Sequence, residues 1–234
     1  MCGRYRVSRR KQIIEEHFDS VSGTEDWNPR YNIAPTQTVP IIRQHPKEPV
    51  RELSLFRWGL LPGWAKDPSV AARMINARSE TASTKPAFSE ALKFRRCVVP
   101  ADGFYEWQKT GKVKQPYCFE IDDGEMFAFA GIWDRWKDAT AKPLETFSIL
   151  TTIPNAVTSS VHDRMPVILN PDSYDLWLDP GVKDTAEVSE LLRACDARSM
   201  RCYPISTRIN STVNDDEECS RRVEPDVVQH HLFS

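Results

Sequence analysis

Met126-Phe127-Ala128-Phe129-Ala130-Gly131-Ile132-Trp133 is the stretch that decides the fold, because it is short, apolar, rich in aromatic residues and bounded by turn residues. That composition is typical of a β-strand. Five further segments share it and lie on both sides of it: residues 38–43, 53–58, 95–100, 117–121 and 146–152. They do not alternate with helices in βαβ order. The sequence therefore predicts an α+β fold with a mainly antiparallel, barrel-like β core rather than a doubly wound parallel sheet.

Helical patterns fill some of the gaps between these strands and are expected to flank the β core. They cover residues 8–20, 86–94, 171–178 and 184–196. Ser8 is the expected cap of the first helix, and Pro171 lies in the first turn of the third. In the fourth, apolar residues share one helical face: Val188, Leu191, Leu192 and Cys195.

A single domain is the simplest organisation of this chain. We find no internal repeat, no low-complexity tract and no shift in composition that marks a linker. We expect one domain over residues 1–220 and a loosely attached tail over 221–234. His230 and His231 in that tail are given no ligand role.

Composition excludes several classes of protein. With 234 residues, 40% of them hydrophobic, the chain is long enough to bury a core, which excludes overall disorder. No stretch reaches the length of a membrane span, and the N-terminus lacks the apolar run of a signal peptide, so we expect a cytoplasmic protein. The net charge of −2 conceals five cations and no acid in residues 1–11. This cluster is consistent with an anion-binding face or with ordinary surface charge.

The six cysteines argue against a metal centre. They include no CxxC pair and no Cys/His cluster at the spacing of zinc ligands, so we expect no metal and no cofactor. Five of them are expected to be reduced, buried and inert: Cys97, Cys118, Cys195, Cys202 and Cys219.

Cys2 is the exception, because removal of Met1 makes it the first residue and gives it an amine beside its thiol. Ordinary pKa values near 8 and 8.5 leave a usable fraction of each nucleophile at neutral pH. With an aldehyde, the amine forms an imine and the thiol closes a thiazolidine. With an amide, the residue resembles an N-terminal nucleophile hydrolase. Arg4 brings positive charge to the same point. The alternative is that Cys2 has no role.

Two further candidates lie where apolar residues give way to polar ones. Asn76 is suited to hold a substrate hydroxyl or the reacting amine, and Arg78 to hold a phosphate; the alternative is a turn Asn with a surface Arg. Glu106 lies between aromatic residues, where an apolar environment would raise its pKa toward neutrality for acid and base work. The alternative is an exposed strand residue.

His162 begins a polar triplet that runs directly into an apolar strand. Histidine is the side chain best suited to move a proton at neutral pH, and Asp163 and Arg164 are suited to orient it or to bind a phosphate. A purely structural histidine is the alternative. In the loop after Arg57, we expect Trp58 in the core and Trp64 near the cleft, where it would stack on a base.

Six motifs in chain order resemble those of the SRAP family, whose name stands for SOS response-associated peptidase. They are residues 1–4, 31–36, 57–60, 75–78, 100–107 and 162–166. The resemblance covers roughly residues 1–215, and the six together are far more specific than any one of them.

The resemblance implies an abasic site processing protein that binds single-stranded DNA in a basic groove of a single α+β domain. It implies that Cys2, after self-removal of Met1, captures the abasic aldehyde as a thiazolidine crosslink. It also implies roles for other residues: Asn76 in positioning the sugar, Glu106 as acid and base, His162 as proton shuttle, and Arg4 and Arg78 as phosphate contacts. Arg164 and Trp64 are expected to contact the DNA on the local grounds given above. Ala65 departs from the pattern, since some members carry a second aromatic residue there.

The remaining expectations follow from the same reading. The partner is single-stranded DNA containing abasic sites, the protein is expected to be a monomer, and it is expected at the nucleoid when bound to DNA. A cysteine peptidase with Cys2, His162 and Glu106 as its triad is the main alternative. A third reading is a DNA-binding module without catalysis.

Overall fold

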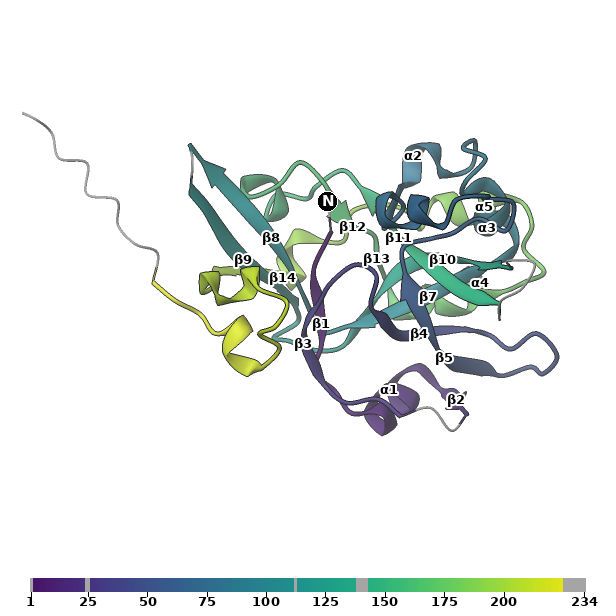
Figure 1. Ribbon diagram of the computed structural model, residues 1–234, viewed down its shortest axis with the longest axis horizontal. Helices are drawn as coiled ribbons and strands as arrows, with labels where there is room; N and C mark the ends of the chain where they lie inside the picture. Colours follow the sequence, from purple (N-terminus) through teal and green to yellow (C-terminus); the bar gives the residue numbers. More distant parts are fainter. Residues whose placement is uncertain (1, 24–25, 112, 138–142, 225–234) are drawn as a thin grey trace, which may run out of the picture.

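Two β-sheets make up most of the molecule (Figure 1). The structure is a computed structural model and describes residues 2–23, 26–111, 113–137 and 143–224. The strands are β1 Tyr5–Val7, β2 Ser20–Ser22, β3 Arg30–Ile33, β4 Thr38–Gln44, β5 Arg51–Trp58, β6 Asn76–Arg78, β7 Arg96–Ala101, β8 Gly103–Thr110, β9 Val113–Ile121, β10 Phe127–Trp136, β11 Leu144–Thr152, β12 Met165–Pro166, β13 Ile168–Leu169 and β14 Met200–Pro204.

The helices are short and lie around these sheets (Figure 1). The α-helices are α1 Lys11–Phe18, α2 Ser79–Ala82, α3 Ser89–Phe94, α4 Tyr174–Leu178 and α5 Thr185–Ser189. The 3-10 helices are Pro68–Arg73, Thr158–Ser160, Pro171–Ser173, Ala197–Ser199, Thr207–Asn210 and Glu217–Ser220.

The sheets are mainly antiparallel, as the sequence predicts. One sheet has the strand order β14-β9-β8-β1-β3, and the other β12-β11-β10-β7-β4-β5-β2, with β6 and β13 added at its side. Parallel pairing joins β11 to β5 and to β6, and β2 to β5. The predicted α+β class with a barrel-like core is confirmed, and all six strands predicted from apolar segments are present.

Strand β10 is buried because strands flank it on both sides. Residues 127–132 are all buried, with β7 on one side and β11 and β13 on the other, which explains a run without polar alternation. Gly131 allows this close packing, since a Cβ there would lie 2.8 Å from the sulfur of Cys97. The aromatic core continues from β10 into the other sheet, where the Phe129 and Tyr5 ring centroids are 5.6 Å apart.

Three expected helices differ from the structure. The first begins at Lys11, and Arg10 rather than Ser8 precedes it. Ser8 instead donates two hydrogen bonds, from its backbone N–H and its hydroxyl, to Asp102 Oδ2 at 2.7 and 2.8 Å. The capping prediction is wrong because Ser8 hydrogen-bonds to the buried carboxylate of Asp102, which lies between β7 and β8.

The segment 184–196 is helical only over Thr185–Ser189. Val188 and Leu192 are nevertheless buried. The apolar pattern therefore predicted their core contacts correctly, but it predicted too long a helix. The segment 86–94 is helical over Ser89–Phe94 alone, whereas 171–178 forms a 3-10 turn followed directly by α4.

The chain beyond residue 220 is described only as far as Glu224. Ile205 and Arg222 form an isolated antiparallel bridge, which attaches this part to the end of β14. His230 and His231 lie outside the described residues. No helix among the described residues is long and apolar enough to cross a membrane.

A buried ion pair connects β1 to the start of β8. Arg6 Nε lies 2.8 Å from Asp102 Oδ1, and Arg6 Nη2 lies 2.5 Å from Glu120 Oε1. The Asp102 side chain is 1% exposed. Removing one partner of such a pair leaves an uncompensated charge in the interior.

We expect Asp102→Ala to lower the free energy of unfolding by about 3 kcal/mol, because it removes one of the two carboxylates that pair with buried Arg6 and the acceptor of both hydrogen bonds from Ser8. Asp175→Ala is the matched control: it breaks a pair with Arg51 in which the Asp175 side chain is 92% exposed, so a loss below about 1 kcal/mol is expected. Urea denaturation of both variants measures the difference. Equal losses would contradict a structural role for the buried pair.

Candidate functional site

The site lies along the edge of β8, next to the N-terminal end of β1. Pairing of the two strands reaches Tyr5 and Phe104, and the N–H of Tyr105 then donates to the carbonyl of Arg4 at 2.9 Å. Beyond this point the β8–β9 hairpin projects from the body of the molecule (Figure 1). An open cavity of about 600 Å³ follows the edge, and it is lined by Glu106, Trp107, Lys109, Lys114, His162 and Asn210.

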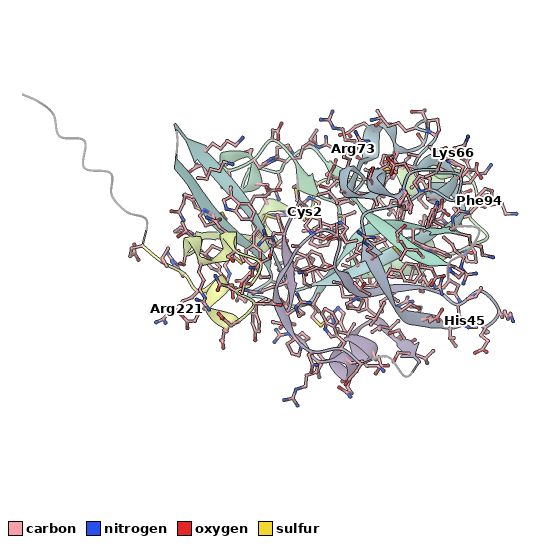
Figure 2. The ribbon with its side chains drawn as sticks, viewed as in Figure 1. Cys2, His45, Lys66, Arg73, Phe94 and Arg221 are labelled. Atoms are coloured by element: carbon pink, nitrogen blue, oxygen red, sulfur yellow. The ribbon has the colours of Figure 1, made fainter. Side chains whose placement is uncertain are left out.

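Cys2 lies immediately before β1, near the middle of the molecule in Figure 2, and is fully buried. Burial raises the pKa of its thiol well above the ordinary value, and the negative charge of Glu106 raises it further. The backbone N–H of Arg4 acts in the opposite direction by stabilising the thiolate. In the chain that still carries Met1, Cys2 is therefore a neutral thiol at neutral pH, beside the Glu106 carboxyl, and the ordinary thiol pKa expected after removal of Met1 stays a prediction.

Glu106 occupies an inward-facing position of β8 and is only 3% exposed. Burial raises its pKa to about 7, with a further contribution from the negative charge of Asp163. The aromatic surroundings thus have the effect that the sequence predicts. At neutral pH the carboxyl is present in both its protonated and its ionised form, which suits it to donate or accept a proton.

His162 lies beside Glu106, with Nε2 4.0 Å from Glu106 Oε2. Its Nδ1 accepts the backbone N–H of Arg164 at 2.9 Å, so the neutral ring carries its proton on Nε2, toward Glu106. Burial lowers the pKa of His162, while Asp163 Oδ1, 2.9 Å from Nδ1, favours the charged form. The net shift is downward, and the ring is neutral at physiological pH.

Asn76 begins β6 and pairs with Ile149 of β11. Its amide Nδ2 donates to the carbonyl of Ile75 at 3.0 Å, and the same carbonyl accepts the indole N–H of Trp58 at 2.9 Å. The Trp58 ring contacts Tyr5 with centroids 5.2 Å apart, which ties Asn76 to the strand that follows Cys2. Asn76 Oδ1 is buried and has no hydrogen-bond donor among the described residues, so it is an acceptor open to a ligand.

The three arginines expected to contact DNA have different environments. Arg4 Nη1 donates to Asn32 Oδ1 at 2.5 Å and to the carbonyl of Ile209 at 2.7 Å, so this guanidinium is partly engaged within the protein. Arg78 is exposed, and its guanidinium has no hydrogen bond or ion pair with the described residues.

Arg164 is held by a bidentate pair with Glu80, at 2.6 and 2.9 Å, and it donates to the carbonyl of Thr151 at 2.6 Å. Its side chain is 11% exposed. These contacts fix the loop that carries His162 against α2 and β11. Of the three arginines, Arg78 is the one that the described structure leaves open to a phosphate.

The tryptophans divide as expected with respect to burial. Trp58 is fully buried in the core, whereas Trp64 is 65% exposed on the loop after β5 and does not line the cavity. Ala65 packs inward with Leu61 and Ala71, so position 65 faces away from solvent. The place of Trp64 near bound DNA stays a prediction.

Four residues of the cavity were not among the candidates from sequence. Trp107 donates its indole N–H to Asn210 Oδ1 at 2.8 Å, and the Arg4 guanidinium lies 5.8 Å from its ring centroid. Lys109 and Lys114 complete the rim. Alternation along β8 places Trp107 and Lys109 on one face, a signal that the sequence carries. The contribution of Asn210, more than 100 residues away, has no such local signal.

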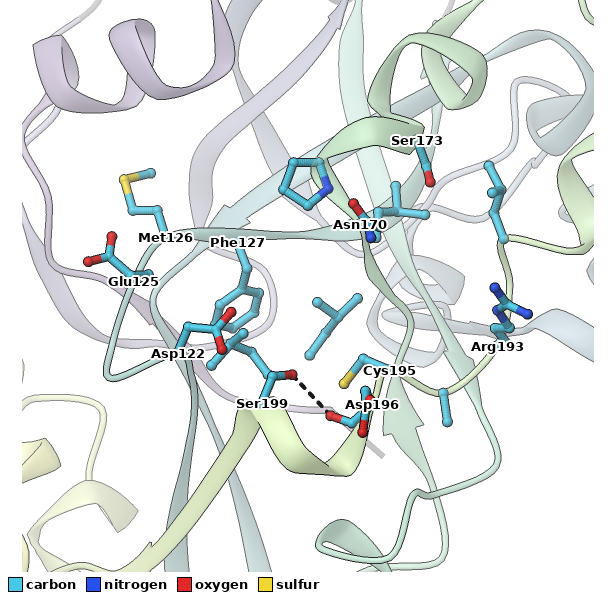
Figure 3. Close-up of a pocket in the computed structure, with 16 residues that line it drawn as sticks. Asp122, Glu125, Met126, Phe127, Asn170, Ser173, Arg193, Cys195, Asp196 and Ser199 are labelled. Carbon is cyan, nitrogen blue, oxygen red and sulfur yellow. Dashed lines mark hydrogen bonds between the residues drawn. The ribbon is translucent and has the colours of Figure 1, made fainter.

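A second cavity, of about 360 Å³, lies at the turn between β9 and β10 (Figure 3). Three acids and one arginine, Arg193, contribute to its lining, and Ser199 Oγ donates to the carbonyl of Asp196 at 3.0 Å. Burial raises the pKa of Cys195 there to about 11, which leaves an unreactive thiol. None of the predicted site residues lines it. The described residues also contain no group of three or more His, Cys, Asp and Glu that could hold a metal ion.

Comparisons with known proteins identify the family of the chain. The abasic site processing protein YoqW of Bacillus subtilis (strain 168) is 39% identical over 221 residues, 93% of this chain and 98% of that protein. The abasic site processing protein HMCES of Gallus gallus is 36% identical over 82% of this chain and 66% of its own length. A crystal structure of a protein from Bacteroides thetaiotaomicron matches with a TM-score of 0.86 at 30% identity, covering 95% of this chain and 100% of that one. Residues 1–212 match the family described as SOS response associated peptidase (SRAP), and the chain therefore belongs to the SRAP family.

Proposed function

We propose that this protein processes abasic sites by binding single-stranded DNA along the β8 edge and joining Cys2 covalently to the sugar aldehyde once Met1 has been removed. The observation that carries the proposal is the grouping of a buried Cys2 with Glu106, whose pKa is about 7, and with His162. The names of the relatives YoqW and HMCES, both abasic site processing proteins, support the same substrate class.

The first step is attack by the α-amine of Cys2 on the sugar aldehyde. The abasic sugar must first open, and the protonated form of Glu106 is suited to give its proton to the departing ring oxygen. Attack forms a C–N bond and a carbinolamine. The open acceptor of Asn76 is suited to hold the reacting amine or a sugar hydroxyl during this step.

Loss of water then gives the protonated imine, and His162 is suited to take the proton that the sugar's anomeric hydroxyl releases on ring opening and to pass it to the departing hydroxyl. The thiol adds last: a C–S bond forms at the imine carbon, the nitrogen regains its lone pair, and the thiol proton passes to the Glu106 carboxylate. One water is released overall. A raised thiol pKa fits this order, because the amine is the first nucleophile and the neutral thiol needs only the activated imine.

Two further activities belong to the same proposal. Met1 is removed by the protein's own site, and the open imine undergoes some β-elimination as a weak lyase side path. We also propose that the protein acts as a monomer at the nucleoid. Arg78 is the favoured phosphate contact, since its guanidinium is open, and Arg4, Arg164 and Trp64 are proposed as further contacts along the strand. The alternative of a cysteine peptidase acting on other proteins is less well supported, because the relatives YoqW and HMCES are both named as abasic site processing proteins.

We expect mass spectrometry of the protein incubated with an abasic oligonucleotide to show loss of Met1 and an adduct one water lighter than the sum of the reactants. Cys2→Ala is expected to form no stable adduct, because it lacks the sulfur that closes the ring. Cys202→Ala, a change in β14 outside the cavity, is the control and is expected to react as the parent does. A stable adduct with Cys2→Ala, or an adduct that retains Met1, would refute the mechanism.

We expect the crosslinking rate at saturating DNA to depend on pH as a bell with its maximum between about 7 and 8. The acid limb reflects protonation of the amine, whose ordinary pKa is about 8, and the alkaline limb reflects ionisation of Glu106. Glu106→Gln removes the second titration. It is expected to react roughly 100-fold more slowly and to rise with pH to a plateau without an alkaline limb. A bell retained in this variant would assign the alkaline limb to another group.

A further inference from the structure

Lys109 and Lys114 lie directly opposite one another in the β8–β9 hairpin. Residues paired in this way have Cβ atoms about 5 Å apart, and like charges at such positions destabilise the sheet. Both lysines are exposed, and neither ammonium forms an ion pair with any described residue. The hairpin therefore holds two adjacent positive charges that the described protein does not neutralise.

The surroundings of this pair add no compensating acid. Glu106 is the one carboxylate that lines the same cavity, and it is 3% exposed. The exposed carboxylate of Asp163 contacts His162 instead. The pair is also close to the reaction centre, since the charge of Lys109 acts on His162.

We infer that Lys109 and Lys114 form a phosphate-binding site that holds the DNA strand beside the lesion. This inference rests on the proposed function and names a contact that the family motifs do not include. Two ammonium groups offer six donors and two charges to one phosphate, and its oxygens relieve their mutual repulsion. Trp107 lies two residues before Lys109 on the same face, about 7 Å along the strand, so an aromatic ring and a cation pair follow one another along a path suited to a nucleotide chain.

The test uses charge reversal, because Lys114→Glu turns the like-charged pair into a cross-strand ion pair with Lys109. We expect the variant to be as stable as the parent or more so, and to bind a single-stranded oligonucleotide containing tetrahydrofuran, an unreactive abasic analogue, roughly tenfold more weakly at low salt. The slope of log affinity against log salt is expected to become shallower by about 0.7, the value for one phosphate contact.

Lys47→Glu is the matched control. Lys47 is exposed in the turn after His45, which Figure 2 shows well away from Cys2. Lys47→Glu makes the same change in net charge as Lys114→Glu. If Lys114→Glu and Lys47→Glu bind the oligonucleotide equally well, the inference is overturned. Lys114→Gln serves in place of Lys114→Glu should the reversal disturb folding, with about a threefold loss expected.

Two oligonucleotide arms identify the source of the phosphate. One carries a 5′-hydroxyl and the other a 5′-phosphate, each with the analogue near that end. A loss with Lys114→Glu on both arms assigns an internal phosphodiester, whereas a loss on the phosphorylated arm alone assigns a terminal phosphate. No loss on either arm overturns the site.

The binding assay also separates this inference from the proposed function. It uses an analogue that has no aldehyde, so it reports on the lysines whether or not Cys2 forms a crosslink. A parent protein that binds through the lysines but forms no adduct would refute the proposed chemistry and leave the phosphate site standing.

Discussion

Backbone pairing of three residues, Tyr5–Val7, between β3 and β8 is the constraint on which the rest of the site depends. Tyr5 has Ile33 on one side and Phe104 on the other, and its ring packs against Trp58 in the core. These pairings anchor the chain three residues after Cys2. A reactive group at the start of a chain is ordinarily among its least ordered parts, and here the sheet holds it beside Glu106.

Burial of the site also sets the protonation states of its side chains. Burial keeps the Cys2 thiol protonated and the His162 ring neutral, and it leaves Glu106 near the midpoint of its titration. The raised pKa of Glu106 has a thermodynamic consequence. Stability that is present below its ordinary value of 4.5 is lost as pH rises to about 7, because the unfolded chain releases this proton earlier. The burial that raises the pKa of Glu106 therefore lowers the stability of the fold at neutral pH.

Apolar runs in the sequence predict most strands of the larger sheet, because strands such as β7 and β10 are buried on both faces and carry few polar residues. The strands of the other sheet are harder to predict from the sequence. Its strand β1 contains Arg6, a charge that is buried only because Asp102 lies nearly a hundred residues later in the chain. The motifs placed Glu106 and His162 in one site, and the structure brings them together. The pairing of Arg164 with Glu80 and the facing lysines depend on register and tertiary contact, which no local pattern encodes.

The parallel pairings of β11 set an order of events during synthesis. This strand contacts β5, β6, β10 and β12, so the larger sheet is incomplete until the ribosome has passed residue 166. Until then β4, β5 and β7 present apolar faces and unpaired edges to solvent, a state prone to association. The sequence separation of these contacts also predicts slow closure of the sheet. The surroundings of Cys2, near the front of the chain, therefore form only after residues made much later have been added.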